Sequence, residues 1–410
     1  MRTVDGSELR RRLEALGDDP RVVVSGNHAT PHHLLSLVDE ALESYRLFTL
    51  NGQAGLPERP GVRHETPFVG PGVRRSAALD YVPARLSLVP RLFASPYLPD
   101  VVLLHTTPPR DGRVSLGIEV NILPAAVEQA RLRGGLVVAQ VNPAMPWTFG
   151  DAELSVDLVD LAVEADAPLP SPLVRPPSDV ASVIAERVAG LVPEGATLQL
   201  GIGAVPDATL AALRDRTGLR LWSEMFSDGV LGLEQAGALD PDEVLVSSFL
   251  FGSPELYAWV DRNPRVRMLR TEQTNDPGRI AGQRRMTSVN AALQVDLFAQ
   301  ANASWVGGSV HSGFGGQTDF IVGALHAPGG QAIVALPSWH PKADRSTVVP
   351  HLEGPATSFQ HSWIVSEQGT AAIWPRPQHE QTAQIVRHVA HPSVREELER
   401  HASERGLLRG

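Results

Sequence analysis

Apolar runs alternate with helix-like segments along most of this chain. Examples are VVLL (101–104), GLVVAQV (135–141), EVLVSSFLF (243–251) and QAIVAL (331–336). These runs are continuous rather than alternately polar, which is typical of strands in parallel sheets that helices cover on both faces. The pattern therefore predicts an α/β fold throughout.

A proline-rich stretch, DAPLPSPLVRPPSD at 166–179, interrupts this pattern. Prolines favour extended backbone, so the stretch is predicted to be a semi-rigid linker. We expect two open, mostly parallel α/β domains, one over residues 1–178 and one over 179–410.

The two halves share a short motif. RVVVSGNHATPHHLL (21–35) and ATLQLGIGAVPDATL (196–210) both contain G-x-x-A-x-P between a predicted strand and a predicted helix. Glycine permits a tight exit from the strand, and proline is tolerated in the first helical turn. The alternative is chance similarity between two βα units. The strands that follow, 44–52 and 218–226, correspond as well, and in this register Glu224 has no acidic counterpart in the first half.

Composition narrows the function classes. The 410 residues include no cysteine, which excludes disulfides, thiolate metal sites and a thiol nucleophile. A net charge of −10 argues against nucleic acid as a partner. No apolar run is long enough to span a membrane, and the first residues lack a signal-peptide core. We expect a cytoplasmic protein that has no membrane as a partner.

Glu224 is the first candidate for chemistry. It follows a strand-like run in LWSEMFSDGV (221–230), among apolar neighbours. Placing a carboxylate there costs several kcal/mol, about 2–7 for a polar group and more for a charge, unless it is paired or solvated. The alternatives to a catalytic role are a buried ion-pair partner and a carboxylate at a helix start.

Three turns offer binding chemistry. The motif at 201–205 opens a helix after a strand, where backbone N–H groups suit a phosphate, although it lacks the third glycine of a dinucleotide fingerprint. The segment 312–320, SGFGGQTDF, is dense enough in glycine to bring backbone close to a ligand. The segment 270–277, RTEQTNDP, carries Asn275. Each of these segments could instead be an ordinary turn. No H-E-x-x-H motif occurs, so no metal site is expected.

Several strings together resemble the acetyl-CoA hydrolase/transferase family, and its 4-hydroxybutyrate CoA-transferase branch in particular. They are LQLGIGAVPDATLAAL, SEMFSDGVLGLEQAG, TNDP, SVNAALQVDL, SGFGGQTDFIVGA and VAHPSVREEL, with GNHATP, LGIEVN and AQVNPAMPWTFGD in the first half. The resemblance runs in one order from about residue 22 to residue 400.

This resemblance implies two similar α/β domains with the active site at their interface. It implies that Glu224 is the nucleophile and that Asn275 and Gly316 lie near the reacting thioester. The implied CoA-binding residues are Gly201, Ile202, Gly203, Ala204, Val205, Gly315 and Gly316. Lys342, the only lysine in the chain, lies where relatives carry a basic loop and is a candidate for the CoA phosphates, with a solvent-exposed lysine as the alternative.

The implied reaction moves CoA between a short-chain acyl-CoA and a carboxylic acid through a glutamyl-CoA thioester. CoA is then a substrate, no permanent cofactor or metal is needed, and we expect a homodimer. The alternatives are an acyl-CoA hydrolase and a CoA-binding protein without activity. The chain departs from the family pattern at Ser366–Gly369, at Val322 and at 373–383, which bears on the choice of acids more than on the chemistry.

Overall fold

The computed structural model describes residues 1–173, 176–354, 356, 358 and 360–408. The chain forms two compact units. The first comprises Met1–Pro172, Val244–Asn275 and His311–Gly316, and the second comprises Leu173–Glu243, Asp276–Val310 and Gln317–Gly410. Within the described residues, no helix is both long and apolar enough to cross a membrane.

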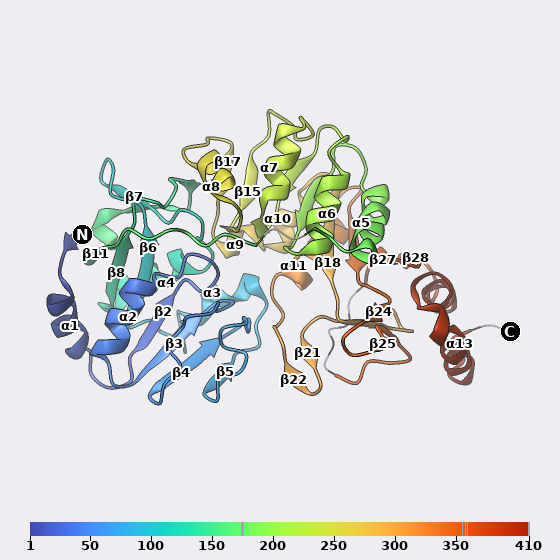
Figure 1. Ribbon diagram of the computed structural model, residues 1–410, viewed down its shortest axis with the longest axis horizontal. Helices are drawn as coiled ribbons and strands as arrows, with labels where there is room; N and C mark the ends of the chain where they lie inside the picture. Colours follow the sequence, from blue (N-terminus) through green and yellow to red (C-terminus); the bar gives the residue numbers. More distant parts are fainter. Residues whose placement is uncertain (174–175, 355, 357, 359, 409–410) are drawn as a thin grey trace. The chain divides into compact units, whose positions relative to one another are not determined.

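The first unit is built on a parallel sheet (Figure 1, blue to teal). Its strand order is β1-β11-β8-β6-β2-β3-β4-β5. The strands are β1 (Arg2–Thr3), β2 (Arg21–Val24), β3 (Tyr45–Thr49), β4 (Val62–Thr66), β5 (Leu79–Tyr81), β6 (Val101–Thr106), β8 (Leu136–Val141) and β11 (Leu161–Glu164). From β2 the chain proceeds outward through β3, β4 and β5, and from β6 it proceeds outward through β8 and β11, with the N-terminal β1 beside β11 at that edge. The carboxyl ends of β2 and β6 therefore form the topological switch point, where open α/β sheets usually bind ligands.

The longer helices of this unit are α1 (Gly6–Glu14), α2 (His32–Ala41) and α4 (Leu123–Arg133). Its smaller elements are α3 (Val89–Leu92), β7 (Arg113–Ser115), β9 (Phe149–Gly150), β10 (Glu153–Ser155), β15 (Leu245–Ser247), β16 (Phe249–Leu250), α8 (Pro254–Val260), β17 (Val266–Met268) and α9 (Thr271–Thr274). Strands β6 and β8 are buried along their whole length.

The second unit contains strands in the order β28-β27-β23-β18-β12-β13 (Figure 1, green to red). They are β12 (Thr197–Leu200), β13 (Arg220–Trp222), β18 (Met286–Ala291), β23 (Gln331–Ala335), β27 (Trp363–Ser366) and β28 (Gly369–Ala372). All of these pair in parallel except β28, which runs antiparallel to β27. The carboxyl ends of β12, β13, β18, β23 and β27 therefore meet at one edge of the sheet.

The helices of the second unit are α5 (Asp179–Leu191), α6 (Ala204–Ala212), α7 (Asp228–Gln235), α10 (Pro277–Ala281), α11 (Gln317–His326), α12 (Gln378–Gln384) and α13 (Arg395–Glu404). The short strands are β14 (Met225–Phe226), β19 (Gln294–Asp296), β20 (Ala301–Asn302), β21 (Trp305–Val306), β22 (Ser309–Val310), β24 (Trp339–His340), β25 (Arg345–Ser346) and β26 (Val348–Val349).

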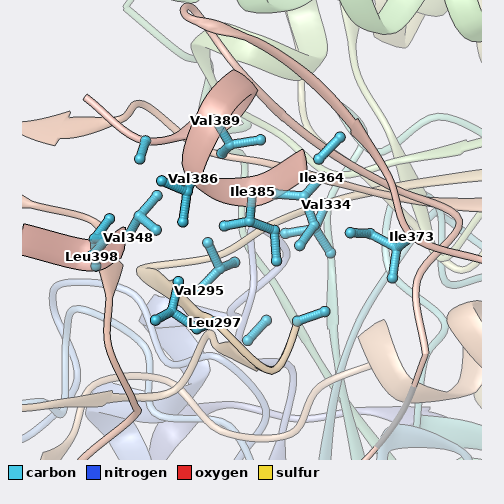
Figure 2. Close-up of a cluster of buried hydrophobic side chains, with 14 of the residues drawn as sticks. Val295, Leu297, Val334, Val348, Ile364, Ile373, Ile385, Val386, Val389 and Leu398 are labelled. Carbon is cyan, nitrogen blue, oxygen red and sulfur yellow. The ribbon is translucent and has the colours of Figure 1, made fainter. Parts of the chain in front are cut away.

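An aliphatic cluster closes the C-terminal end of this unit (Figure 2). Strand residues Val334 and Ile364 pack there with Ile385 and Val389, which belong to a single π-helical turn, and with Leu398 of α13. The labelled side chains carry no polar atoms, so their burial needs no hydrogen-bond partners. Each one contributes about 1.5–3 kcal/mol by leaving water.

The predicted α/β class with mostly parallel sheets is confirmed. Runs 101–104, 135–141 and 331–336 fall on β6, β8 and β23, whereas 243–251 forms two short strands, β15 and β16. The repeated motif also folds twice as strand–helix–parallel strand, β2–α2–β3 and β12–α6–β13. The division into domains 1–178 and 179–410 stays a prediction, and residues 174–175 of the linker lie outside the described residues.

Candidate functional site

Glu224 lies in a bend between β13 and β14, at the carboxyl edge of the second unit's sheet. Its side chain is half-buried, while its neighbours Ser223 and Met225 are buried. Strand β13 pairs in parallel with β12, whose carboxyl end is Leu200. The acid is therefore held at a strand end, beside the turn that follows β12.

The turn after β12 contains the predicted CoA-binding residues. Gly203 caps helix α6 with φ 120° and ψ 178°, a conformation essentially restricted to glycine. A Cβ atom built on Gly201 or Gly203 would meet no described heavy atom within 4 Å. The backbone of this turn is thus open to a ligand, and the first N–H groups of the nine-residue α6 lie just beyond it.

Two hydrogen bonds tie the Glu224 segment to this glycine turn. The Ser223 hydroxyl donates to the Leu200 carbonyl oxygen at 3.2 Å, one residue before the turn begins. The Ser227 hydroxyl donates to the Asp207 carboxylate at 2.8 Å, in the first turn of α6. The structure therefore brings Glu224 and the segment 201–205 together in one unit.

The second glycine segment, 312–320, is divided between the units: residues 312–316 belong to the first unit, and residues 317–320 begin α11 of the second. The Val69 N–H donates to the Ser312 oxygen at 2.7 Å, and the Leu86 N–H donates to the Gly315 oxygen at 2.9 Å. Gly315 has φ +55°, and a Cβ there would lie 2.9 Å from the Phe68 ring. Close packing therefore accounts for glycine at position 315, and Gly316 is buried beside it.

Asn275 is fully buried at the C-terminal end of α9, in the first unit. Its side-chain oxygen accepts a hydrogen bond from the Thr274 hydroxyl at 2.7 Å. The adjacent Asp276 belongs to the second unit, where its carboxylate caps α10 by accepting from the Arg279 N–H at 2.8 Å. The alternative of an ordinary turn therefore holds for Asp276. The assignment of Asn275 to the site stays a prediction.

Lys342 occupies an exposed turn between β24 and β25. This hairpin follows the carboxyl end of β23, which β18 separates from β12. Adjacent strands are spaced by about 4.8 Å, so the ends of β23 and β12 lie about 10 Å apart. Within the described part of the chain, the Lys342 ammonium has no hydrogen bond or ion pair, which leaves it available to a phosphate.

Glu367 fixes the start of that hairpin. Its carboxylate accepts from the Ser338 N–H at 2.8 Å and from the Ser338 hydroxyl. Burial raises the pKa of Glu367, but these hydrogen bonds outweigh it and hold the pKa below its ordinary value. Glu367 thus orders the backbone that leads to Lys342.

Two of the positions that depart from the family pattern, Val322 and residues 373–383, lie close to each other elsewhere in the second unit. Val322 and Trp374 line one cavity of about 560 Å³. Ile373 donates its N–H to the Ser362 oxygen at 2.9 Å, so Trp374 lies beyond the amino end of β27. This is the edge of the sheet opposite the glycine turn.

Sequence reasoning missed a polar cluster at the switch point of the first unit. Glu119 is fully buried and accepts from the Asn27 N–H at 3.2 Å, the Asn27 amide at 2.9 Å, the Ala29 N–H at 3.1 Å and the Asn121 amide at 3.3 Å. Burial raises the pKa of Glu119, and these donors counteract the rise. The carboxylate therefore holds the loop after β2 in place, with His28 stacked on Phe251 at 3.5 Å. The available signal was an acid inside the apolar string LGIEVNIL.

No group of three metal-ligating side chains is present among the described residues. A further cavity of about 730 Å³ lies in the first unit and is lined by none of the predicted site residues.

Comparison with known proteins agrees with these motifs. Models of the acetyl-CoA hydrolase/transferase N-terminal and C-terminal domains match residues 49–175 and 252–402. The chain is 38% identical to 4-hydroxybutyrate coenzyme A transferase of Clostridium kluyveri, over 82% of this chain and 81% of that protein. It is 34% identical to succinyl-CoA:acetate/propanoyl-CoA:succinate CoA transferase of Fasciola hepatica, over 95% and 86%.

Among solved structures, 4-hydroxybutyrate CoA-transferase from Porphyromonas gingivalis superimposes with a TM-score of 0.81 at 28% identity, covering 98% of each chain. The family models and the relatives lead to one conclusion. This chain belongs to the acetyl-CoA hydrolase/transferase family.

Proposed function

We propose that this protein is a CoA-transferase that moves CoA between a short-chain acyl-CoA and a carboxylic acid through a glutamyl-CoA thioester on Glu224. The observation that carries the proposal is the half-buried carboxylate of Glu224, tied through Ser223 to the strand end that precedes an open glycine turn. A half-buried carboxylate and an open glycine turn therefore share one edge of a parallel sheet, which supports the roles of nucleophile and anion-binding backbone. Ligands of open α/β sheets usually bind at this edge.

The glycine turn is suited to the phosphates of CoA. The N-terminus of α6 carries unpaired N–H groups and the positive end of the helix dipole. Glycine at 201 and 203 leaves the approach to these groups free of side chains. We assign Lys342 to the same phosphates as a point charge. Binding energy from this remote part of the substrate would hold the thioester against Glu224.

The reaction proceeds in balanced steps. The Glu224 carboxylate attacks the acyl-CoA carbonyl, the C–S bond breaks, and an acyl-glutamyl anhydride and CoA thiolate form. The thiolate then attacks the glutamyl carbonyl and releases the first carboxylate, which leaves glutamyl-CoA. A second carboxylate reverses both steps and departs as the new acyl-CoA. We assign the backbone near Gly315 and Gly316, with the Asn275 amide, to the oxyanions of these steps.

Hydrolysis is the second candidate function, because water could resolve the same glutamyl intermediate. The relatives named acetyl-CoA hydrolase are more distant, with 28% identity over about half of this chain. The transferase proposal therefore has the stronger support. It includes acyl-CoA and small acids as the partners, no permanent cofactor, a cytoplasmic location and a homodimer with the active site between domains 1–178 and 179–410.

The test is to trap the intermediate. The protein is incubated with acetyl-CoA or butyryl-CoA and the intact mass is measured. Formation of new acyl-CoA from several carboxylates and release of free thiol are then measured separately, because transfer conserves the thioester and hydrolysis releases the thiol. The unmodified protein should gain the mass of CoA minus water, and Glu224→Ala should gain none and lose transfer while remaining folded. Glu186→Ala, an exposed acid on α5, is the matched control and should behave like the unmodified protein.

Each outcome has a separate meaning. Full transfer by Glu224→Ala would refute the assignment of the nucleophile. Thiol release that needs no carboxylate acceptor would favour the hydrolase. Glu224→Asp should also lose most activity, because withdrawing the carboxylate by one methylene disturbs the attack geometry.

A further inference from the structure

The cavity of about 730 Å³ in the first unit lies outside the residues that the proposed reaction uses. Its volume is in the range of ligand pockets, about 300–1,000 Å³. It is lined by the segments that follow β6 and β8, by α8, and by linker residues 168, 169 and 171. All of these segments belong to the first unit, so the cavity does not depend on how the units are placed.

Its walls are apolar and stiff. Trp147 and Tyr257 are buried side chains of the lining. The Tyr257 hydroxyl donates to the Pro170 oxygen at 2.8 Å, which ties the linker to α8. Proline fixes φ, so a wall rich in proline is already ordered before a ligand arrives. The proline members of the lining are Pro108, Pro109, Pro143, Pro146, Pro168 and Pro254.

Arg262 supplies a cation at this cavity from a strained backbone. It follows the end of α8 with φ +54°, a left-handed conformation that is unfavourable for a non-glycine residue. Two hydrogen bonds hold it there, from the Arg262 N–H to the Trp147 oxygen at 2.8 Å and from the Trp147 N–H to the Asp261 carboxylate at 2.7 Å. The Arg262 guanidinium has no hydrogen bond or ion pair within the described ranges, so its donors are available.

The charge of the lining favours a monoanion. The charged lining residues are Arg110, Asp261 and Arg262, two positive and one negative, which leaves one net positive charge. Arg110 already pairs with Asp111 at 3.6 Å, and Asp261 is engaged by the Trp147 N–H. The unpaired guanidinium of Arg262 is therefore the group that an anion would meet.

We propose that this cavity is a second ligand site, which binds a small monocarboxylate with an apolar body. The carboxylate would take two parallel N–H donors of Arg262, a geometry that guanidinium provides and ammonium does not. The apolar body would lie against Trp147 and Tyr257. The site takes the same class of acid as the transfer reaction but shares no residue with it.

Calorimetric titration with 4-phenylbutyrate tests this site, and 4-phenylbutanamide serves as the uncharged isostere. Arg262→Gly removes the guanidinium and suits the left-handed backbone, so the variant should fold. We expect its affinity for the carboxylate to fall at least tenfold and its affinity for the amide to stay unchanged. Arg133→Gln, an exposed arginine at the end of α4, is the matched control and should bind both probes like the unmodified protein.

A second variant changes the volume of the cavity rather than its charge. Ala258→Leu, on the exposed part of α8, places extra volume in the cavity and should weaken both probes. Unchanged carboxylate binding in both variants would overturn the proposal. So would loss of glutamyl-CoA formation in Arg262→Gly, because the cavity would then be part of the transfer site. Neither probe needs CoA, so a failure of the proposed transfer reaction leaves this test intact.

Discussion

The imidazole of His105 is expected to make this protein sensitive to acid. Its Nδ1 lies 3.1 Å from the Ala29 carbonyl oxygen, which can only accept, so Nδ1 carries the proton. Its Nε2 lies 3.2 Å from the Gln140 amide nitrogen and 3.0 Å from the Asn142 amide nitrogen. The Gln140 oxygen already accepts from the Leu34 N–H at 3.1 Å, which fixes the direction of that amide. Both amides therefore donate to Nε2, and only the neutral imidazole fits.

Burial lowers the pKa of His105 from 6.5 to about 4, and the charge of His32 adds to the effect while the hydrogen bond to Ala29 opposes it. The unfolded chain then binds a proton more readily than the folded one between these two values. The contribution to stability is complete above pH 6.5 and is lost as the pH falls toward 4. From a difference of about 2.5 pKa units, this amounts to about 3 kcal/mol in total and about 2 kcal/mol by pH 5.

His105→Gln removes the titration and keeps an acceptor for the two amides. At pH 7.5 it should be less stable by about 1–3 kcal/mol, because the hydrogen bond to Ala29 is lost. Urea unfolding followed by tryptophan fluorescence should show this difference shrinking by about 2 kcal/mol at pH 5. His33→Gln, on the exposed side of α2, is the matched control and should follow the pH profile of the unmodified protein. A His105→Gln difference that is the same at both pH values would refute the reasoning.

Two further predictions concern the candidate site. Gly315→Ala should cost about 1–3 kcal/mol more stability than Gly307→Ala, because both glycines have φ +55° but only a Cβ at 315 meets the Phe68 ring, at 2.9 Å. Equal losses in urea unfolding would show that packing at 315 is not tight. Lys342→Met should raise the KM for acyl-CoA several-fold and weaken its dependence on salt, because one screened ion pair with phosphate is lost. An unchanged KM and salt profile in steady-state kinetics would show that Lys342 does not bind the phosphates.

Patterns within one segment predicted the framework well. Continuous apolar runs predicted β6, β8 and β23, since a strand buried on both faces needs no polar positions. The G-x-x-A-x-P motif predicted the parallel strand–helix–strand units, because glycine and proline act on their own backbone. Glu224 and the turn at 201–205 lie together because each follows the carboxyl end of a strand, and the two strands are parallel neighbours.

Features that depend on distant segments were not predictable in this way. The need for glycine at 315 comes from close packing against the Phe68 ring, nearly 250 positions away in the chain. The left-handed Arg262 depends on hydrogen bonds with Trp147, and neither segment carries a recognisable motif for the other. A single sequence contains no record of such pairings, so the cavity beside Arg262 could not be predicted.

Glu119 and Glu224 show where reasoning from local pattern reaches its limit. Both acids lie in apolar strings, LGIEVNIL and LWSEMF, and both should be costly there by the same argument. Glu119 meets that cost with four N–H donors, three of them from a loop about 90 residues earlier, and becomes a fully buried anchor. Glu224 is half-buried at a strand end, beside backbone that is open to a ligand. An acid in an apolar string therefore indicates that something stabilises it, and only the surrounding structure shows what that is.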